Sequence, residues 1–122
     1  MNDKKYDLEE RTAVFGEKVI GFLKGLKDTS INKSIKNQLV RSATSIGANY
    51  MEADGAESKR DFKHKIALCK KEAKETKHWL RMLSTTDDNL KTKCREIWKE
   101  GQELTLIFSA ILRNTNNKEK SK

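Results

Sequence analysis

The sequence predicts an all-α fold, an up-down-up-down antiparallel four-helix bundle, on three observations. The 122-residue chain has no proline, the residue that breaks helices most strongly, and only six glycines. Its 35% hydrophobic and 36% charged residues suit helices with narrow apolar stripes. Apolar residues recur at helical spacing in four stretches with short polar connections, which makes consecutive helices antiparallel neighbours.

The first two predicted helices cover residues 7–26 and 31–53. Asp7 is the expected N-cap of the first helix, and Gly55 is expected to end the second. The apolar face of the first helix consists of Leu8, Phe15, Val19, Phe22 and Leu26. That of the second consists of Ile31, Ile35, Leu39, Ala43, Ile46, Tyr50 and Ala53.

The third predicted helix begins after Ser58, its expected N-cap, and the fourth runs from Leu90 to about Arg113. No repeat or interdomain linker interrupts the pattern. We therefore expect one bundle domain over residues 1–113. Residues 114–122 are polar and lysine-rich, and we expect them to form a disordered basic tail.

The apolar arc of the third helix is wide, roughly 160° at 100° per residue. It comprises Phe62, Ile66, Leu68, Cys69, Ala73, Thr76, Trp79, Leu80 and Leu83. The fourth helix also carries more apolar residues than one seam needs: Ile107, Phe108, Ile111 and Leu112. Either the bundle wraps tightly around these residues or the two helices present apolar surface to another subunit. We favour self-association.

A basic stripe lies beside this arc, within about 60° and along about 33 Å of helix. It comprises Lys59, Lys63, Lys70, Lys74, Lys77 and Arg81. The whole chain has 26 Lys and Arg against 18 Asp and Glu, a formal net charge of +8, which favours a polyanionic partner. The stripe could track the phosphates of RNA or DNA without reading bases. The alternative is an ordinary solvated helix face.

Polar residues also follow one edge of the apolar faces of the second and third helices. They are Arg41, Ser42, Ser45, Asn49 and Glu52, with Glu72 and Glu75 opposite. A turn near residue 55 places Arg41 beside Glu72 or Glu75, and Glu52 beside Arg60, His64 or Lys65. We interpret these as interhelical pairs that set the register of a structural polar cluster. A catalytic site at Arg41, Glu52, Glu72 and Glu75 is the weaker alternative.

Other chemistry has little support in the sequence. His64 and His78 are about 21 Å apart along one helix, too far to share a metal. Cys69 and Cys94 are offset by about 13 Å, beyond disulfide reach, so free core cysteines are expected. We expect no metal, no cofactor and no enzymatic activity. The polar N-terminus and the short apolar run at 104–112 favour a cytoplasmic protein without a membrane span.

The segment from Gln38 to Leu83 resembles the family of 23S rRNA intervening-sequence proteins. The matching motifs are QLxRSxxSIxAN from Gln38 to Asn49, EA at Glu52 and Ala53, SxxDF from Ser58 to Phe62, KEAxET from Lys71 to Thr76, and WLR from Trp79 to Arg81. The opening ERxxVFxxxVxxF pattern, from Glu10 to Phe22, also fits.

The resemblance implies a left-handed four-helix bundle that assembles into a ring, typically a homopentamer. The family is also similar to the accessory variability proteins of diversity-generating retroelements, which are basic and pentameric and bind nucleic acid and a reverse transcriptase. The resemblance implies no catalytic residues. The signature positions of the 23S rRNA intervening-sequence family coincide with the polar cluster described above.

Two functions are therefore expected. The first is a homo-oligomeric bundle that binds nucleic acid through the basic stripe and is associated with a ribonucleoprotein or a reverse transcriptase. The second is an adaptor whose protein partner docks on the apolar faces of the third and fourth helices, with the basic charge only steering the encounter.

Overall fold

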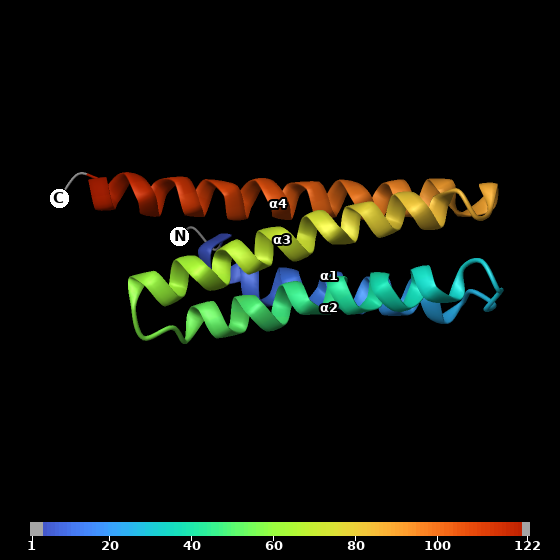
Figure 1. The fold of residues 1–122 in the computed structure, drawn as a ribbon, viewed down its shortest axis with the longest axis horizontal. Coiled ribbons are helices and arrows are strands. Elements are labelled where there is room, and N and C mark those ends of the chain that lie inside the picture. The colour runs from blue at the N-terminus through green and yellow to red at the C-terminus, as the bar shows by residue number, and fades with distance from the viewer. Residues whose placement is uncertain (1–3, 121–122) are drawn as a thin grey trace.

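The structure, a computed structural model, describes residues 4–120 and the side chains of residues 8–118. Within residues 4–120 there are helices and no strands, so the all-α prediction is confirmed. The elements are α1 (Lys4–Lys24), α2 (Lys33–Asp54), α3 (Lys59–Ser84), a short 3₁₀ helix η1 (Asp88–Leu90) and α4 (Lys91–Lys120) (Figure 1).

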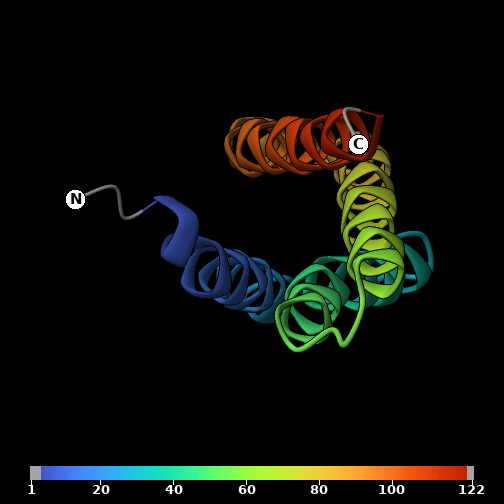
Figure 2. The same ribbon diagram turned by 90° about the vertical axis from the view of Figure 1, so that its left-hand side faces the viewer.

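The chain reverses direction at each connection, so that consecutive helices lie side by side (Figure 1). Viewed along the bundle, α1, α2, α3 and α4 follow one another in chain order, and α4 stands away from α1 (Figure 2). Close packing accordingly joins α1 to α2, α2 to α3, and α3 to α4. The bundle is therefore more open on the side between its first and last helices.

Large side chains fill the space that this open arrangement leaves. Phe15 of α1 and Phe108 of α4 are 1% and 0% exposed. The ring of Phe108 lies 6.4 Å from that of Tyr50 of α2, centroid to centroid. At the surface, Arg11 of α1 reaches across to α4 and pairs with Glu100 at 3.1 Å and with Glu103 at 3.3 Å. Side chains rather than close backbones thus connect α1 with α4.

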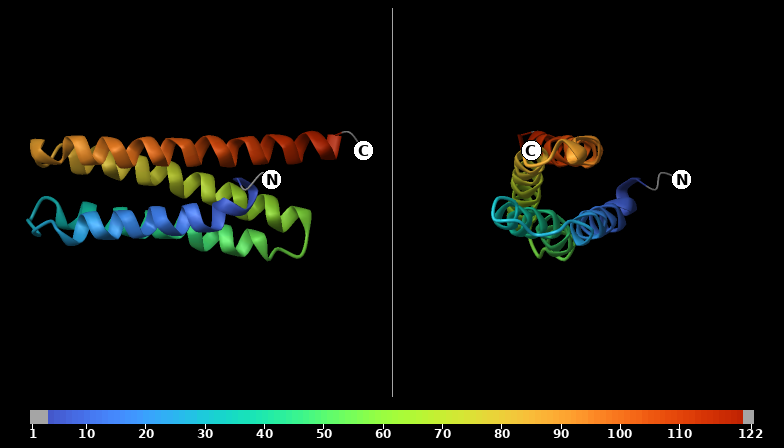
Figure 3. Two further views of the ribbon diagram at one scale, coloured as in Figure 1. Left: turned by 180° about the vertical axis from the view of Figure 1, so that it is seen from behind. Right: turned by 90° about the vertical axis from the view of Figure 1, so that its right-hand side faces the viewer.

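The third helix lies between α2 and α4 (Figure 3), and this position explains its wide apolar arc. Its residues Ile66, Cys69, Ala73, Leu80 and Leu83 are fully buried. Among the described residues, the large hydrophobic side chains that are exposed are Val14, Ile20, Ile31, Met51, Trp98 and Leu106, and none belongs to α3. Most of the arc is therefore buried within the chain, while Phe62, Leu68 and Trp79 are partly exposed, and self-association through α3 stays a prediction.

The connection between α1 and α2 is held by reciprocal side-chain bonds. Thr29 and Asn32 bond each other: the Thr29 amide donates to Asn32 Oδ1 at 2.8 Å, and the Asn32 amide donates to Thr29 Oγ1 at 3.0 Å. Asn32 Nδ2 also donates to the Lys27 carbonyl at 3.1 Å. These bonds explain why α2 begins at Lys33 rather than at the predicted residue 31.

Of three other helix boundaries predicted from the sequence, one is confirmed and two are wrong. Ser58 caps α3 as expected, because its hydroxyl accepts from the Asp61 amide at 3.0 Å. Asp7 cannot be the N-cap of α1, which already includes Lys4. The helix end predicted near Arg113 is wrong as well.

The fourth helix continues to Lys120, through most of the stretch expected to be a disordered tail. No proline or glycine interrupts residues 114–120, and the Thr115 hydroxyl donates to the Ile111 carbonyl at 2.8 Å across the predicted end. Residues 121–122 lie outside the described part of the chain.

Gly21 offers a test of helix propensity in α1. It lies in the helix, and a Cβ added there would meet no atom within 4 Å. We expect Gly21→Ala to raise the free energy of unfolding by about 1 kcal/mol, because alanine loses less conformational entropy in a helix. Urea denaturation would measure it. Gly101→Ala should gain less, since its Cβ would lie 3.3 Å from Lys77 Cγ. No gain at Gly21 would contradict this account.

Candidate functional site

The polar cluster between α2 and α3 contains the two interhelical pairs that the register indicates. Arg41 of α2 forms an ion pair with Glu72 of α3 at 3.4 Å and another with Glu75. Lys65 of α3 donates to Glu52 of α2 at 2.6 Å, and it is Lys65, among the three basic residues considered, that forms this bond. The spacing from the turn at Gly55 therefore located both contacts.

The remaining polar groups of this cluster are bonded within the protein. The hydroxyls of Ser42 and Thr76, both fully buried, lie 3.0 Å apart in hydrogen-bond contact. Ser45 Oγ donates to the Arg41 carbonyl at 2.7 Å, and Asn49 Nδ2 donates to the Ser45 carbonyl at 2.9 Å. Such mutually satisfied groups suit a register-setting layer better than a reactive site.

Trp79 extends the same cluster along α3. Its indole N–H donates to Glu75 Oε2 at 3.0 Å. This hydrogen bond lowers the pKa of Glu75, and Arg41 lowers it further. Glu75 is therefore a carboxylate committed to two donors, which makes it a poor candidate for a general base.

The basic stripe of α3 is not uniform along its length. Lys74 and Arg81 are exposed and Lys70 is half-buried; within the described residues none of the three has an ion pair with an acidic side chain. Lys59 and Lys63, near the start of the helix, each already interact with another group of the chain. The stripe cations available for an external anion thus lie from Lys70 onward along α3.

Lys77 differs from its neighbours because it turns toward α4. Its ammonium donates to Gln102 Oε1 at 2.5 Å and lies 5.1 Å from the centroid of the Trp98 ring. Burial lowers the pKa of Lys77, and the adjacent Lys74 lowers it further. The sequence placed Lys77 among the phosphate contacts, whereas the structure uses it to join α3 to α4, because α4 packs along this side of the stripe.

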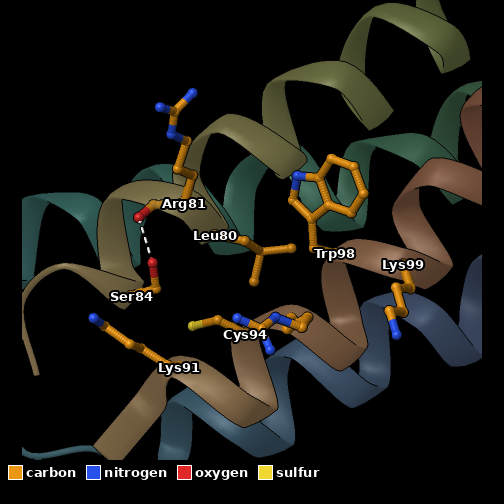
Figure 4. A pocket seen from close by; sticks show the side chains of 8 residues that line it. Leu80, Arg81, Ser84, Lys91, Cys94, Trp98 and Lys99 are labelled. Carbon is orange, nitrogen blue, oxygen red and sulfur yellow. Dashed lines mark hydrogen bonds between the residues drawn. The ribbon is translucent and has the colours of Figure 1, made fainter. Parts of the chain in front are cut away.

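A groove of about 510 Å³ lies between the last turns of α3 and the first turns of α4 (Figure 4). We call it the α3–α4 groove; it is lined by Leu80, Arg81, Ser84, Lys91, Cys94, Arg95, Trp98 and Lys99. Half of these residues are cations and none is acidic. At its outer end Lys91 pairs with the exposed Asp88 at 3.2 Å. The other three cations have no ion pair among the described residues.

The contribution of α4 to this surface was not predicted from the sequence. Lys91, Arg95 and Lys99 are spaced by four residues, which places them along one side of a helix. This spacing could have been noticed, but the register of α3 against α4 was needed to bring them to Arg81. Trp98 was not singled out from the sequence either. In the structure its side chain is 38% exposed and lies beside these cations.

A second groove, of about 330 Å³, lies between α1 and α2 and has a different character. It is lined by Glu9, Thr12, Ala13, Gly16, Glu17, Ile20, Thr44, Gly47, Ala48 and Met51. Two of these residues are acidic and none is basic, so the groove does not suit an anion. The small residues let α1 and α2 approach closely: a Cβ on Gly47 would lie 3.3 Å from Thr12 Oγ1.

Both cysteines are buried and free, so the prediction of unpaired core thiols is confirmed. Burial raises the pKa of Cys69 to about 12 and that of Cys94 to about 11. Both thiols are therefore protonated and unreactive at neutral pH. Among the residues that the structure describes, no group of three or more possible metal ligands is assembled. Within the same residues, no helix has the apolar length needed to cross a bilayer.

Comparison with known proteins supports the bundle as a whole. The family model described as 23S rRNA-intervening sequence protein matches residues 4–110. The chain is similar to a crystal structure of a protein of unknown function from the S23 ribosomal protein family of Bacteroides thetaiotaomicron. The two are 29% identical with a TM-score of 0.75, and the alignment covers 86% of this chain and 97% of that one. No curated protein matches the chain.

Proposed function

The chain belongs to the 23S rRNA-intervening sequence protein family, and on that premise we propose that it binds nucleic acid without catalysing a reaction. The proposed binding surface combines Lys70, Lys74 and Arg81 of α3 with the cations of the α3–α4 groove on α4. We further propose that the chain acts as a homo-oligomer associated with a ribonucleoprotein or a reverse transcriptase.

The observation that carries this proposal is the meeting of two rows of cations at one groove. Arg81 of α3 and the three cations of α4 line the same cavity, without an acidic residue among them. Because like charges repel, gathering them costs free energy that a polyanion would recover on binding. A phosphodiester backbone supplies the complementary charges in a row. Nothing in the groove indicates recognition of particular bases, so RNA and DNA are both suitable ligands.

The adaptor alternative has less support. It expects a protein partner on the apolar faces of the third and fourth helices, yet α2 and α4 bury most of the apolar face of α3. On α4 the large exposed hydrophobic side chains are Trp98 and Leu106. Trp98 lies among cations, which makes that part of the face a poor apolar docking site. A protein partner that copurifies after nuclease treatment would favour the adaptor.

Self-association is part of the proposal. The exposed apolar residues that support it are not those that the sequence indicated. Val14, Ile20 and Met51 are exposed on α1 and α2. A ring of left-handed bundles, as the family resemblance implies, would repeat the basic groove in every subunit and raise affinity through multiple attachment. Light scattering with and without RNA would measure the mass of the assembly.

The salt dependence of binding tests the proposed function directly. We expect the affinity for a labelled RNA to fall linearly with salt on logarithmic axes between about 50 and 200 mM, with a slope of about −0.7 to −0.9 for each phosphate contacted. Fluorescence anisotropy would measure it. Engagement of four groove cations predicts a slope of about −3. Absence of binding at low salt, or an affinity independent of salt, would reject the proposal.

A further inference from the structure

We propose that the α3–α4 groove accepts an unpaired nucleotide, so that the protein prefers single-stranded to double-stranded nucleic acid. In this arrangement the base lies against Trp98 and the flanking phosphates lie at Arg81, Arg95 and Lys99. The inference rests on the nucleic-acid binding proposed above and specifies the form of the ligand.

Trp98 is available for a ligand, because it is not part of the hydrophobic core. Trp79, the other tryptophan, packs against the hydrophobic core and bonds to Glu75. Trp98 lies outside that core cluster, is 38% exposed and lines the groove. A large indole held partly in water beside cations is the arrangement that proteins use to stack the bases of single strands.

Neighbouring side chains support the indole of Trp98. The Lys77 ammonium lies 5.1 Å from the ring centroid and is itself held by Gln102 at 2.5 Å. This cation–π contact orients the ring before a ligand arrives. Binding then does not have to order the tryptophan, which reduces the entropic cost of stacking.

The groove matches the ligand in size and in charge. The volume of about 510 Å³ is in the range of small-molecule sites and leaves room for a base with its sugar. Arg81 lines the groove from α3, and Lys91, Arg95 and Lys99 line it from α4 together with Trp98. A duplex keeps its bases stacked inside and can offer only phosphates, whereas a single strand can turn a base outward.

The test compares Trp98→Ala with Trp98→Phe on two ligands. Fluorescence anisotropy would follow a labelled oligouridylate of about twelve nucleotides and an RNA duplex of the same length, using the full chain. We expect Trp98→Ala to lose about tenfold in affinity for the single strand and to change affinity for the duplex by less than about twofold. Trp98→Phe keeps an aromatic face and should stay within about threefold of the wild type.

A direct readout comes from the intrinsic fluorescence of Trp98 in a Trp79→Phe background. Stacking of a base on the indole is expected to quench this emission in proportion to the bound single strand, and the duplex should not quench it. Single-stranded DNA should behave like RNA, because every base presents a π face.

The outcomes separate this inference from the proposed function. If both ligands bind and Trp98→Ala weakens them equally or not at all, the base site is rejected while nucleic-acid binding stands. Failure of Trp98→Phe to restore the preference for the single strand would likewise reject stacking. If the wild type binds neither ligand at low salt, both proposals fail together.

Discussion

Replacing Phe108 by alanine is expected to lower the free energy of unfolding by about 3–5 kcal/mol. The Phe108 side chain is fully buried, and its ring contacts Tyr50 at a centroid separation of 6.4 Å. Truncation removes apolar burial and leaves a cavity where α1 and α4 are too far apart to collapse onto it. Since a domain of this size is stable by only about 5–15 kcal/mol, the variant should unfold at a much lower urea concentration.

Leu106 provides the control on the same helix. Its side chain is 58% exposed, so Leu106→Ala should change the free energy of unfolding by less than about 0.5 kcal/mol. Both variants would be measured by urea denaturation at one chain concentration, because self-association would stabilise the folded state. Similar losses for the two variants would show that Phe108 does not fill the interior as described.

The second large effect concerns binding. We expect the triple variant Lys70→Glu, Lys74→Glu, Arg81→Glu to bind RNA at least about 100-fold more weakly at low salt, because three favourable phosphate contacts become repulsive. None of the three side chains has an ion pair among the described residues, so the fold should be retained. Anisotropy would measure affinity, and circular dichroism would confirm helix content.

A matched variant separates local from overall charge. Lys18→Glu, Lys24→Glu, Lys27→Glu alters three exposed lysines on α1 and the connection after it, and lowers the net charge of +8 by the same amount. We expect it to reduce affinity far less than the α3 variant. Equal losses in the two variants would mean that net charge, not the proposed surface, governs binding.

The contacts between α2 and α3 could be predicted from the sequence because a helix has a constant rise. Once Gly55 marks the turn, each residue of α2 has a calculable neighbour on α3, which located Arg41 beside Glu72 and Glu75 and Glu52 beside Lys65. The same arithmetic, applied to the turn between α3 and α4, kept Cys69 apart from Cys94. Local geometry and the position of one turn were sufficient for each of these pairs of helices.

The number of neighbours that cover each helix could not be predicted in this way. A wide apolar arc on α3 is compatible with another subunit or with two flanking helices, and only the tertiary arrangement distinguishes them. The residues that line the α3–α4 groove likewise depend on the tertiary arrangement. Lys91, Arg95 and Lys99 share one side of α4 by spacing alone, but acidic residues such as Glu96 and Glu100 are interspersed. Packing against α3 decides which side chains border Arg81.

The packing of each helix on the one before it also bears on how the protein forms during synthesis. Each helix packs on the helix next to it in the sequence, so the loops that must close to form these contacts are short. Closing a short loop costs little entropy, and such topologies fold rapidly. The α1–α2 hairpin can assemble while later residues are still being translated, and α3 and α4 can then add in turn. Arg11 would form its ion pairs with Glu100 and Glu103 only when the last helix has emerged from the ribosome.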